Sequence, residues 1–118
     1  MLTRVVRRFA IKWKEQVKRD IEDIKVLVYS KSYCPYCLNT KKVLETMQVG
    51  AKVYELDQIS EGQEIQSALI DLTKQRTFPN IFISGVHIGG NSDLMDGLKS
   101  GKIQKLFEDN KITYKPLA

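Results

Sequence analysis

The sequence predicts a single α/β domain, and three observations support that prediction. An apolar run over residues 24–29, a helix-like run over 38–48 and a strand-like run over 51–56 follow one another in the order of a βαβ unit. Hydrophobic residues make up 42% and charged residues 28% of the 118 residues, which is typical of one globular domain. No apolar stretch approaches the roughly 18 residues that a membrane span requires, so no membrane partner is expected.

The first predicted element is a basic amphipathic helix over about residues 4–21. Its apolar positions recur at three- and four-residue spacing: Val6, Phe9, Ala10, Trp13, Val17 and Ile21. Residues 1–20 carry seven basic and two acidic side chains, so the net charge of +5 belongs to this segment. The helix either packs its apolar stripe on the sheet or serves as a mitochondrial targeting segment. We expect a cytoplasmic protein, with a mitochondrial location as the alternative.

The remaining elements follow from hydrophobic periodicity and from turn residues. The predicted strands are 24–30, 51–56, 80–83 and 86–88. The predicted helices are 35–48, 60–74, 92–99 and 102–109. Ser60, three residues before Gln63, is the predicted cap of the helix that it begins. Ser84-Gly85 predicts a hairpin turn, and Gly101 separates the last two helices.

The only two cysteines, Cys34 and Cys37, are the strongest functional signal in the chain. They lie where a strand gives way to a helix, and the unpaired N–H groups and dipole of a helix start favour thiolate over thiol. Pro35 fits the first helical turn, which places Cys37 one turn on, within bonding reach of Cys34. A bridge across so small a loop stabilises little, so the spacing favours redox exchange. Zinc is not expected, because it needs two further ligands and His87 is the only histidine.

Three separated motifs resemble those of dithiol glutaredoxins of the thioredoxin superfamily. They are Lys31-Ser32-Tyr33-Cys34-Pro35-Tyr36-Cys37, Gln75-Arg76-Thr77-Phe78-Pro79 and Gly89-Gly90-Asn91-Ser92-Asp93. The resemblance covers about residues 5–109 and implies one glutaredoxin domain over residues 1–118. It implies an α/β thioredoxin-like fold, with a mixed four-stranded sheet in the order 2-1-3-4 flanked by about five helices. It also implies a cis peptide bond between Phe78 and Pro79.

The resemblance assigns roles to residues around the two thiols. Cys34 is the expected nucleophile, and Cys37 is the expected resolving thiol. The expected glutathione-binding residues are Lys31, Tyr36, Gln66, Thr77, Phe78, Pro79, Ser92 and Asp93. Without the resemblance, Lys31 and Gln66 are ordinary exposed residues. Phe78 departs from the family pattern, because most relatives have valine at this position.

Each end of glutathione has an expected partner. Lys31 is expected to contact the glycine carboxylate, and its charge to favour the thiolate of Cys34. The backbone of Phe78 is expected to pair with the cysteinyl part of the tripeptide. N–H groups at Ser92 and Asp93 can hold the γ-glutamyl carboxylate, while the side chain of Asp93 meets the ammonium or caps the helix.

The implied function is that of a glutathione-dependent thiol–disulfide oxidoreductase, an enzyme that uses a Cys34/Cys37 dithiol. It reduces protein–glutathione mixed disulfides and protein or small-molecule disulfides. The expected partners are glutathione, as reducing cosubstrate, and disulfide-bonded or glutathionylated proteins. We expect a monomer that binds no nucleic acid and no metal.

Two other functions compete with this one. A thioredoxin-like enzyme would draw its electrons from a reductase protein. A dimer that bridges a [2Fe–2S] cluster would not be an enzyme. Pro35 argues against the cluster, because cluster-binding relatives commonly have a smaller or less rigid residue there.

Overall fold

The computed structural model describes the backbone of residues 4–117 and the side chains of residues 12–117. The elements are α1 (Arg4–Asp23), β1 (Val26–Ser30), α2 (Pro35–Thr46), β2 (Lys52–Glu55), α3 (Gly62–Thr73), β3 (Asn80–Ile83), β4 (Val86–Gly89), α4 (Asn91–Ser100) and α5 (Lys102–Asp109). They correspond in order and type to the predicted elements. Within the described residues, no helix is both long and apolar enough to cross a membrane.

The four strands form one mixed sheet in the order β2-β1-β3-β4, as predicted. β1 pairs in parallel with β2 and antiparallel with β3, and β4 pairs antiparallel with β3. A parallel pair needs a crossover connection, which α2 provides between β1 and β2. β1 and β3 are buried along their whole length because they form the centre of the sheet. The chain therefore leaves a fixed central strand at Ser30, immediately before the loop that carries the cysteines.

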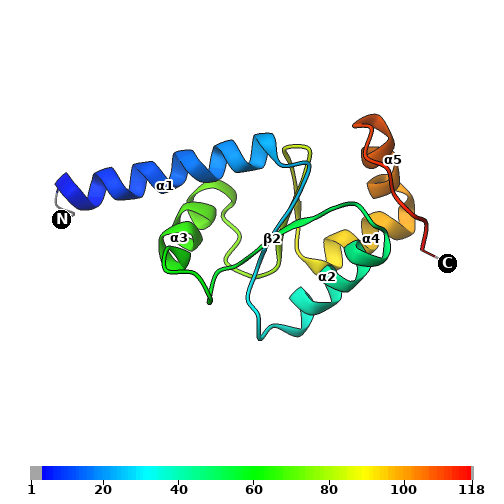
Figure 1. Ribbon diagram of the computed structural model, residues 1–118, viewed down its shortest axis with the longest axis horizontal. Coiled ribbons are helices and arrows are strands. Elements are labelled where there is room, and N and C mark those ends of the chain that lie inside the picture. The colour runs from blue at the N-terminus through cyan, green and yellow to red at the C-terminus, as the bar shows by residue number, and fades with distance from the viewer. Residues whose placement is uncertain (1–3, 118) are drawn as a thin grey trace.

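Helices cover both faces of this sheet (Figure 1). Successive side chains of β1 point to opposite faces, so they join two separate hydrophobic clusters. Val26 and Val28 pack with residues of α2, α4 and α5, whereas Leu27 and Tyr29 pack with residues of α1 and α3. The result is a three-layer α/β/α arrangement with a core on each side of the sheet.

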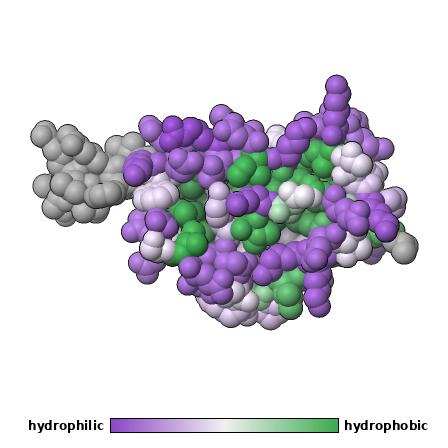
Figure 2. Space-filling model, in the orientation of Figure 1, coloured by the Kyte–Doolittle hydropathy of each residue, from purple (hydrophilic) through white to green (hydrophobic). Residues whose placement is uncertain are grey.

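Helix α1 packs along α3 and ends two residues beyond the predicted range of 4–21. Val17 is fully buried, and Trp13 and Ile21 pack partly buried around the same cluster. Ile24 donates its N–H to the carbonyl of Asp20, so the strand starts at residue 26 and not at 24. The predicted apolar positions before residue 12 lie outside the described side chains. Figure 2 shows hydrophilic residues along the outer side of α1 from residue 12 onward, and hydrophobic residues in the middle of this face.

The start of α3 differs from the prediction. The helix begins at Gly62 after Glu61, and in the described structure no side chain caps it, so the predicted cap at Ser60 is wrong. Gly62 lies directly against the backbone of Leu56, and a Cβ there would overlap the Leu56 carbonyl oxygen. Because only glycine allows so close an approach, backbone contact with Leu56 sets the start of this helix.

Candidate active site

The two thiols lie at the junction of β1 and α2. Cys34 precedes the helix with an extended backbone (φ −90°, ψ 120°), and Pro35 occupies the first helical position. The carbonyl of Cys34 accepts a hydrogen bond from the N–H of Leu38 at 3.0 Å. Both cysteines are free thiols, but Cys34 is half-buried and Cys37 is completely buried one turn later. Of the two, Cys34 is therefore the one that a bulky disulfide can reach.

The pKa values of the two thiols are shifted in opposite directions, and each shift has its own cause. Desolvation opposes ionisation of Cys34, but several groups outweigh it and lower the pKa of this thiol. They are the N–H groups of Cys37 and Tyr36, the Cys37 thiol and the charge of Lys41. Burial raises the pKa of Cys37, although the N–H of Lys31, 3.5 Å from the sulfur, opposes this effect. A thiol that ionises more readily than usual, beside a buried thiol that ionises less readily, is the combination that the predicted nucleophilic and resolving roles require.

Lys41 also affects the acidity of Cys34, although no pattern in the sequence predicted this. Its charge lowers the pKa of Cys34, a role that the resemblance gives to Lys31. The Nζ atom of Lys41 lies 3.1 Å from Oε1 of Glu55, at the end of β2. Its spacing could have predicted this effect. Seven residues are almost two helical turns, so Lys41 lies on the same side of the helix as Cys34.

Lys31 and Gln66 meet beside the thiols, although one follows β1 and the other lies on α3. The Lys31 Nζ atom lies 2.9 Å from Oε1 of Gln66, so one wall of the site joins two distant parts of the chain. The same Nζ lies 5.4 Å from the centroid of the Phe78 ring, within the range of a cation–π contact. The phenyl ring that replaces the usual valine therefore helps to hold the Lys31 ammonium at this wall.

The segment Thr77–Pro79 forms a second wall. Its Phe78–Pro79 peptide bond is cis, as predicted, and the Phe78 carbonyl oxygen lies 3.7 Å from Sγ of Cys34. The side-chain amide of Gln75 donates to the carbonyls of Thr77 and Pro79, each at 2.9 Å. These two bonds fix the segment so that the Phe78 backbone faces Sγ of Cys34.

His87 supports this wall from β4. Its Nε2 atom lies 2.9 Å from Oδ1 of Asn80 and 3.2 Å from Oε1 of Gln75. Desolvation lowers the pKa of His87, although the charge of Asp93 opposes this effect, so the ring is neutral at physiological pH. Within residues 12–117, no three His, Cys, Asp or Glu side chains gather into a group that could hold a metal ion.

The start of α4 forms the third wall. Oδ2 of Asp93 accepts the N–H of Gly90 at 2.8 Å and so caps the helix. Gly89 has a positive φ of 115°, and a Cβ there would overlap the Asp93 carboxylate, so glycine is required. Because the first N–H groups of a helix have no partner within it, those of Ser92 and Asp93 are available to an anion.

Two hydrogen bonds connect the start of α4 to α2. Oδ1 of Asn91 accepts hydrogen bonds from Nδ2 of Asn39 and from Oγ1 of the buried Thr40, each at 2.9 Å. The helix that carries the thiols and the helix with the free N–H groups are therefore held in a fixed relation.

The loop before Cys34 is held by Asp57, a residue that no pattern in the sequence predicted. The carboxylate of Asp57 accepts a hydrogen bond from the Ser32 N–H at 2.9 Å and another from its hydroxyl, and these bonds lower the pKa of Asp57. Tyr33 and Tyr36 are 74% and 67% exposed, so two aromatic rings close to Cys34 in the sequence are open to solvent. The predicted contact residue Tyr36 is thus open to a ligand.

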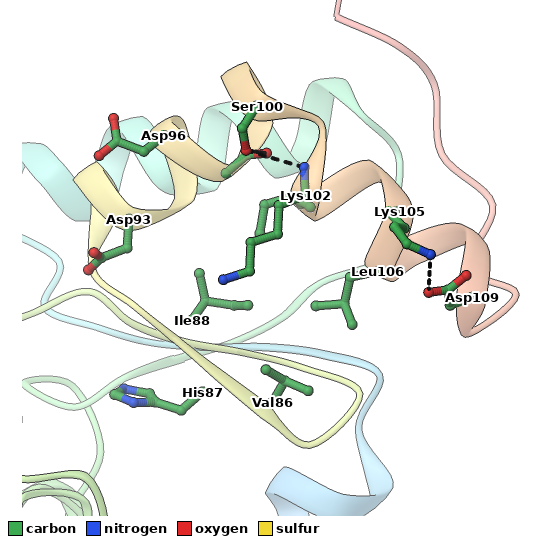
Figure 3. Close-up of a pocket in the computed structure, with 12 residues that line it drawn as sticks. Val86, His87, Ile88, Asp93, Asp96, Ser100, Lys102, Lys105, Leu106 and Asp109 are labelled. Carbon is green, nitrogen blue, oxygen red and sulfur yellow. Dashed lines mark hydrogen bonds and ion pairs between the residues drawn. The ribbon is translucent and has the colours of Figure 1, made fainter.

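A separate groove of about 530 Å³ runs between β4 and the helices α4 and α5 (Figure 3). Asp93 lies at one end and Asp109 at the other, and the Lys102 side chain extends over Ile88 between them. Among its described lining residues there is no cysteine, so the groove adjoins the third wall without forming part of the thiol site.

Comparisons with known proteins agree with this geometry. The family model described as Glutaredoxin matches residues 26–88. Glutaredoxin-C6 of Oryza sativa subsp. japonica is 45% identical over 94 residues, which cover 80% of this chain and 84% of the relative. The structure of a buckwheat glutaredoxin–glutathione complex superposes with a TM-score of 0.84 at 33% identity and covers 89% of this chain and 96% of that chain. This chain therefore belongs to the glutaredoxin family of thiol–disulfide oxidoreductases.

Proposed function

We propose that this protein reduces protein–glutathione mixed disulfides, and protein or small-molecule disulfides, with glutathione as the electron donor. The observation that carries the proposal is the pairing of the half-buried Cys34, whose pKa is lowered, with the buried Cys37, whose pKa is raised. Access and thiolate character decide which thiol attacks a disulfide. The two cysteines therefore take different parts in one exchange reaction.

The walls around Cys34 support glutathione as the donor. Glutathione carries a carboxylate at its glycine end and both a carboxylate and an ammonium at its γ-glutamyl end. Lys31 offers a cation to the first end, and the N–H groups at the start of α4, with Asp93, offer partners to the second. Between them, the Phe78 backbone beside Cys34 is available to the peptide part of the ligand. The likeness to the buckwheat glutaredoxin–glutathione complex supports the same ligand.

With a glutathionylated protein, the Cys34 thiolate attacks the glutathione sulfur. A Cys34–glutathione disulfide forms, the original S–S bond breaks, and the protein thiolate leaves and takes a proton from water. The thiolate of a second glutathione then attacks the glutathionyl sulfur. Oxidised glutathione forms, and the electron pair of the broken bond returns to Cys34 as thiolate.

With a protein disulfide, Cys37 has a further step. Attack by Cys34 forms a mixed disulfide with one substrate sulfur and releases the other as a thiol. Cys37 then loses its proton and attacks the Cys34 sulfur, which releases the second substrate thiol and leaves a Cys34–Cys37 disulfide. Two molecules of glutathione reduce this disulfide and leave as oxidised glutathione.

The test compares two variants that each lack one thiol. Turnover of a glutathionylated peptide and of a protein disulfide is followed with glutathione and glutathione reductase. Cys34→Ser should lose both activities, whereas Cys37→Ser should lose reduction of the protein disulfide and keep most of the deglutathionylation. Thioredoxin reductase with NADPH serves as the alternative donor. Turnover with that donor and none with glutathione would refute the proposal.

A further inference from the structure

A cavity of about 300 Å³ lies on the face of the sheet that α1 and α3 cover. Its walls include three aromatic residues, Trp13 from α1, Tyr29 from β1 and Tyr54 from β2. Two acidic residues, Asp20 and Glu61, also line it. Among the described lining residues there is no cysteine, so the cavity is distinct from the thiol site. Its volume is at the lower end of the range of small-molecule pockets, about 300–1,000 Å³.

The aromatic residues offer faces that attract cations. The Tyr29 and Tyr54 rings are stacked, with centroids 5.6 Å apart and planes inclined by 20°. Lys52 Nζ lies 5.4 Å from the Tyr54 centroid, and Lys12 Nζ lies 5.7 Å from the Trp13 centroid. Neither lysine is among the described residues that line the cavity. Two of the three rings thus already have an ammonium group of this chain within the range of a cation–π contact.

A buried hydroxyl in the cavity wall is a second, independent observation. Tyr29 is 1% exposed, and in the described part of the chain its hydroxyl has no hydrogen-bond partner. Burial raises the pKa values of Tyr29 and Tyr54, and the charge of Asp20 raises both further. The phenols therefore stay neutral, and the field of Asp20 reaches both. Native proteins rarely leave a buried hydroxyl unpaired, so this oxygen still needs a hydrogen-bond partner.

The residues that line the cavity carry a net negative charge although the whole chain carries a net charge of +5. Asp20 and Glu61 line it, and its described lining residues include no lysine or arginine. Gln16 Nε2 donates to Oδ1 of Asp20 at 3.0 Å, which fixes the half-buried carboxylate. A cation is the ligand that this charge favours.

We propose that this cavity binds an organic ammonium ion, a compact cation with an apolar or aromatic body. The body packs against the three aromatic rings. The ammonium donates hydrogen bonds to the Asp20 carboxylate and to the Tyr29 hydroxyl oxygen. A neutral molecule of the same shape keeps the packing but loses the charge interaction.

The test uses the reduced full-length chain and two probes of the same shape, 2-phenylethylammonium chloride and neutral 2-phenylethanol. Each probe is titrated and followed by ¹H–¹⁵N NMR. The ammonium probe should shift the Trp13 indole N–H and the Tyr29 and Tyr54 amides, and it should bind about tenfold more tightly than the alcohol. Asp20→Asn should remove this preference. Asp23→Asn, at an exposed acidic residue of the same helix, should preserve it.

A further variant distinguishes a role of the Tyr29 hydroxyl in binding from a role in stability. Tyr29→Phe removes one oxygen atom, and it should weaken the ammonium probe about threefold while the thermal unfolding midpoint does not fall. Equal affinity for the two probes would overturn the proposal. Equal losses in Asp20→Asn and Asp23→Asn, or shifts confined to residues outside the cavity, would overturn it as well.

Discussion

Two neighbouring rows of side chains along α2 have opposite surroundings. Cys37, Thr40 and Leu44 form a row that is buried on the sheet. Cys34 and Lys41 form the adjacent row, which is half-buried at the edge of the active site. Burial keeps the Cys37 thiol protonated, while N–H groups at the helix start and the Lys41 charge favour the Cys34 thiolate. The two cysteines thus differ in acidity because the fold places them in different rows.

The largest expected effect is a difference in alkylation rate between the two thiols. In Cys37→Ser the remaining Cys34 should react with iodoacetamide at pH 7 about a thousandfold faster than Cys37 does in Cys34→Ser. The signs follow from the pKa shifts. The rate of Cys34 should reach half its plateau at a lower pH than the rate of an unperturbed thiol, and the rate of Cys37 should do so at a higher pH. If alkylation of Cys34 and of Cys37 reached half its plateau at the same pH, the proposed difference between the two rows would be wrong.

Truncation in the buried row should change stability and leave thiol chemistry intact. Leu44 is 1% exposed in the cluster that joins α2 to the sheet. Leu44→Ala should lower the free energy of unfolding by about 3 kcal/mol, because it leaves a cavity in this cluster. Chemical denaturation measures the loss, and the next residue on the exposed side provides the control, Glu45→Ala. A folded Leu44→Ala protein whose Cys34 midpoint moves toward the usual thiol value would show that the rows are not independent.

Contiguous motifs account for the parts of the site that the sequence predicted. The positions of Cys34 and Cys37 at a strand–helix junction follow from local patterns that read in order along the chain. The sheet order and the cis bond before Pro79 are also confirmed, and the family resemblance supplied both. The proposed roles of the glutathione-binding residues remain predictions.

The details that the sequence did not predict depend on contacts between distant residues. Asp57 fixes the Ser32 loop through two hydrogen bonds, and a single aspartate after a strand has no periodic signal. Gly62 starts a helix because it contacts the Leu56 backbone, and local capping rules favoured Ser60 instead. Lys41 acts through its charge at a distance, which a motif of adjacent residues does not include.

The smallest expected effect is the contribution of Lys41 to the lowered pKa of Cys34, its neighbour in the half-buried row. Lys41→Gln should raise the pKa of Cys34 and slow its alkylation at pH 7 about threefold, because the charge that favours the thiolate is lost. Lys42→Gln removes an equal charge from the adjacent, exposed position and should have no comparable effect. The measurement uses the Cys37→Ser background, so that one thiol reacts.

The ion pair of Lys41 with Glu55 allows a test of the opposite sign. Glu55→Gln removes the carboxylate that lies 3.1 Å from the Lys41 ammonium, so the lysine charge acts on Cys34 without partial neutralisation. The pKa of Cys34 should then fall, and alkylation at a pH below its midpoint should become faster. If Lys41→Gln and Glu55→Gln shifted the midpoint in the same direction, the effect would come from distortion of α2 and not from charge. Opposite shifts would instead assign the low pKa of Cys34 partly to a residue two turns away, in the same row of the helix.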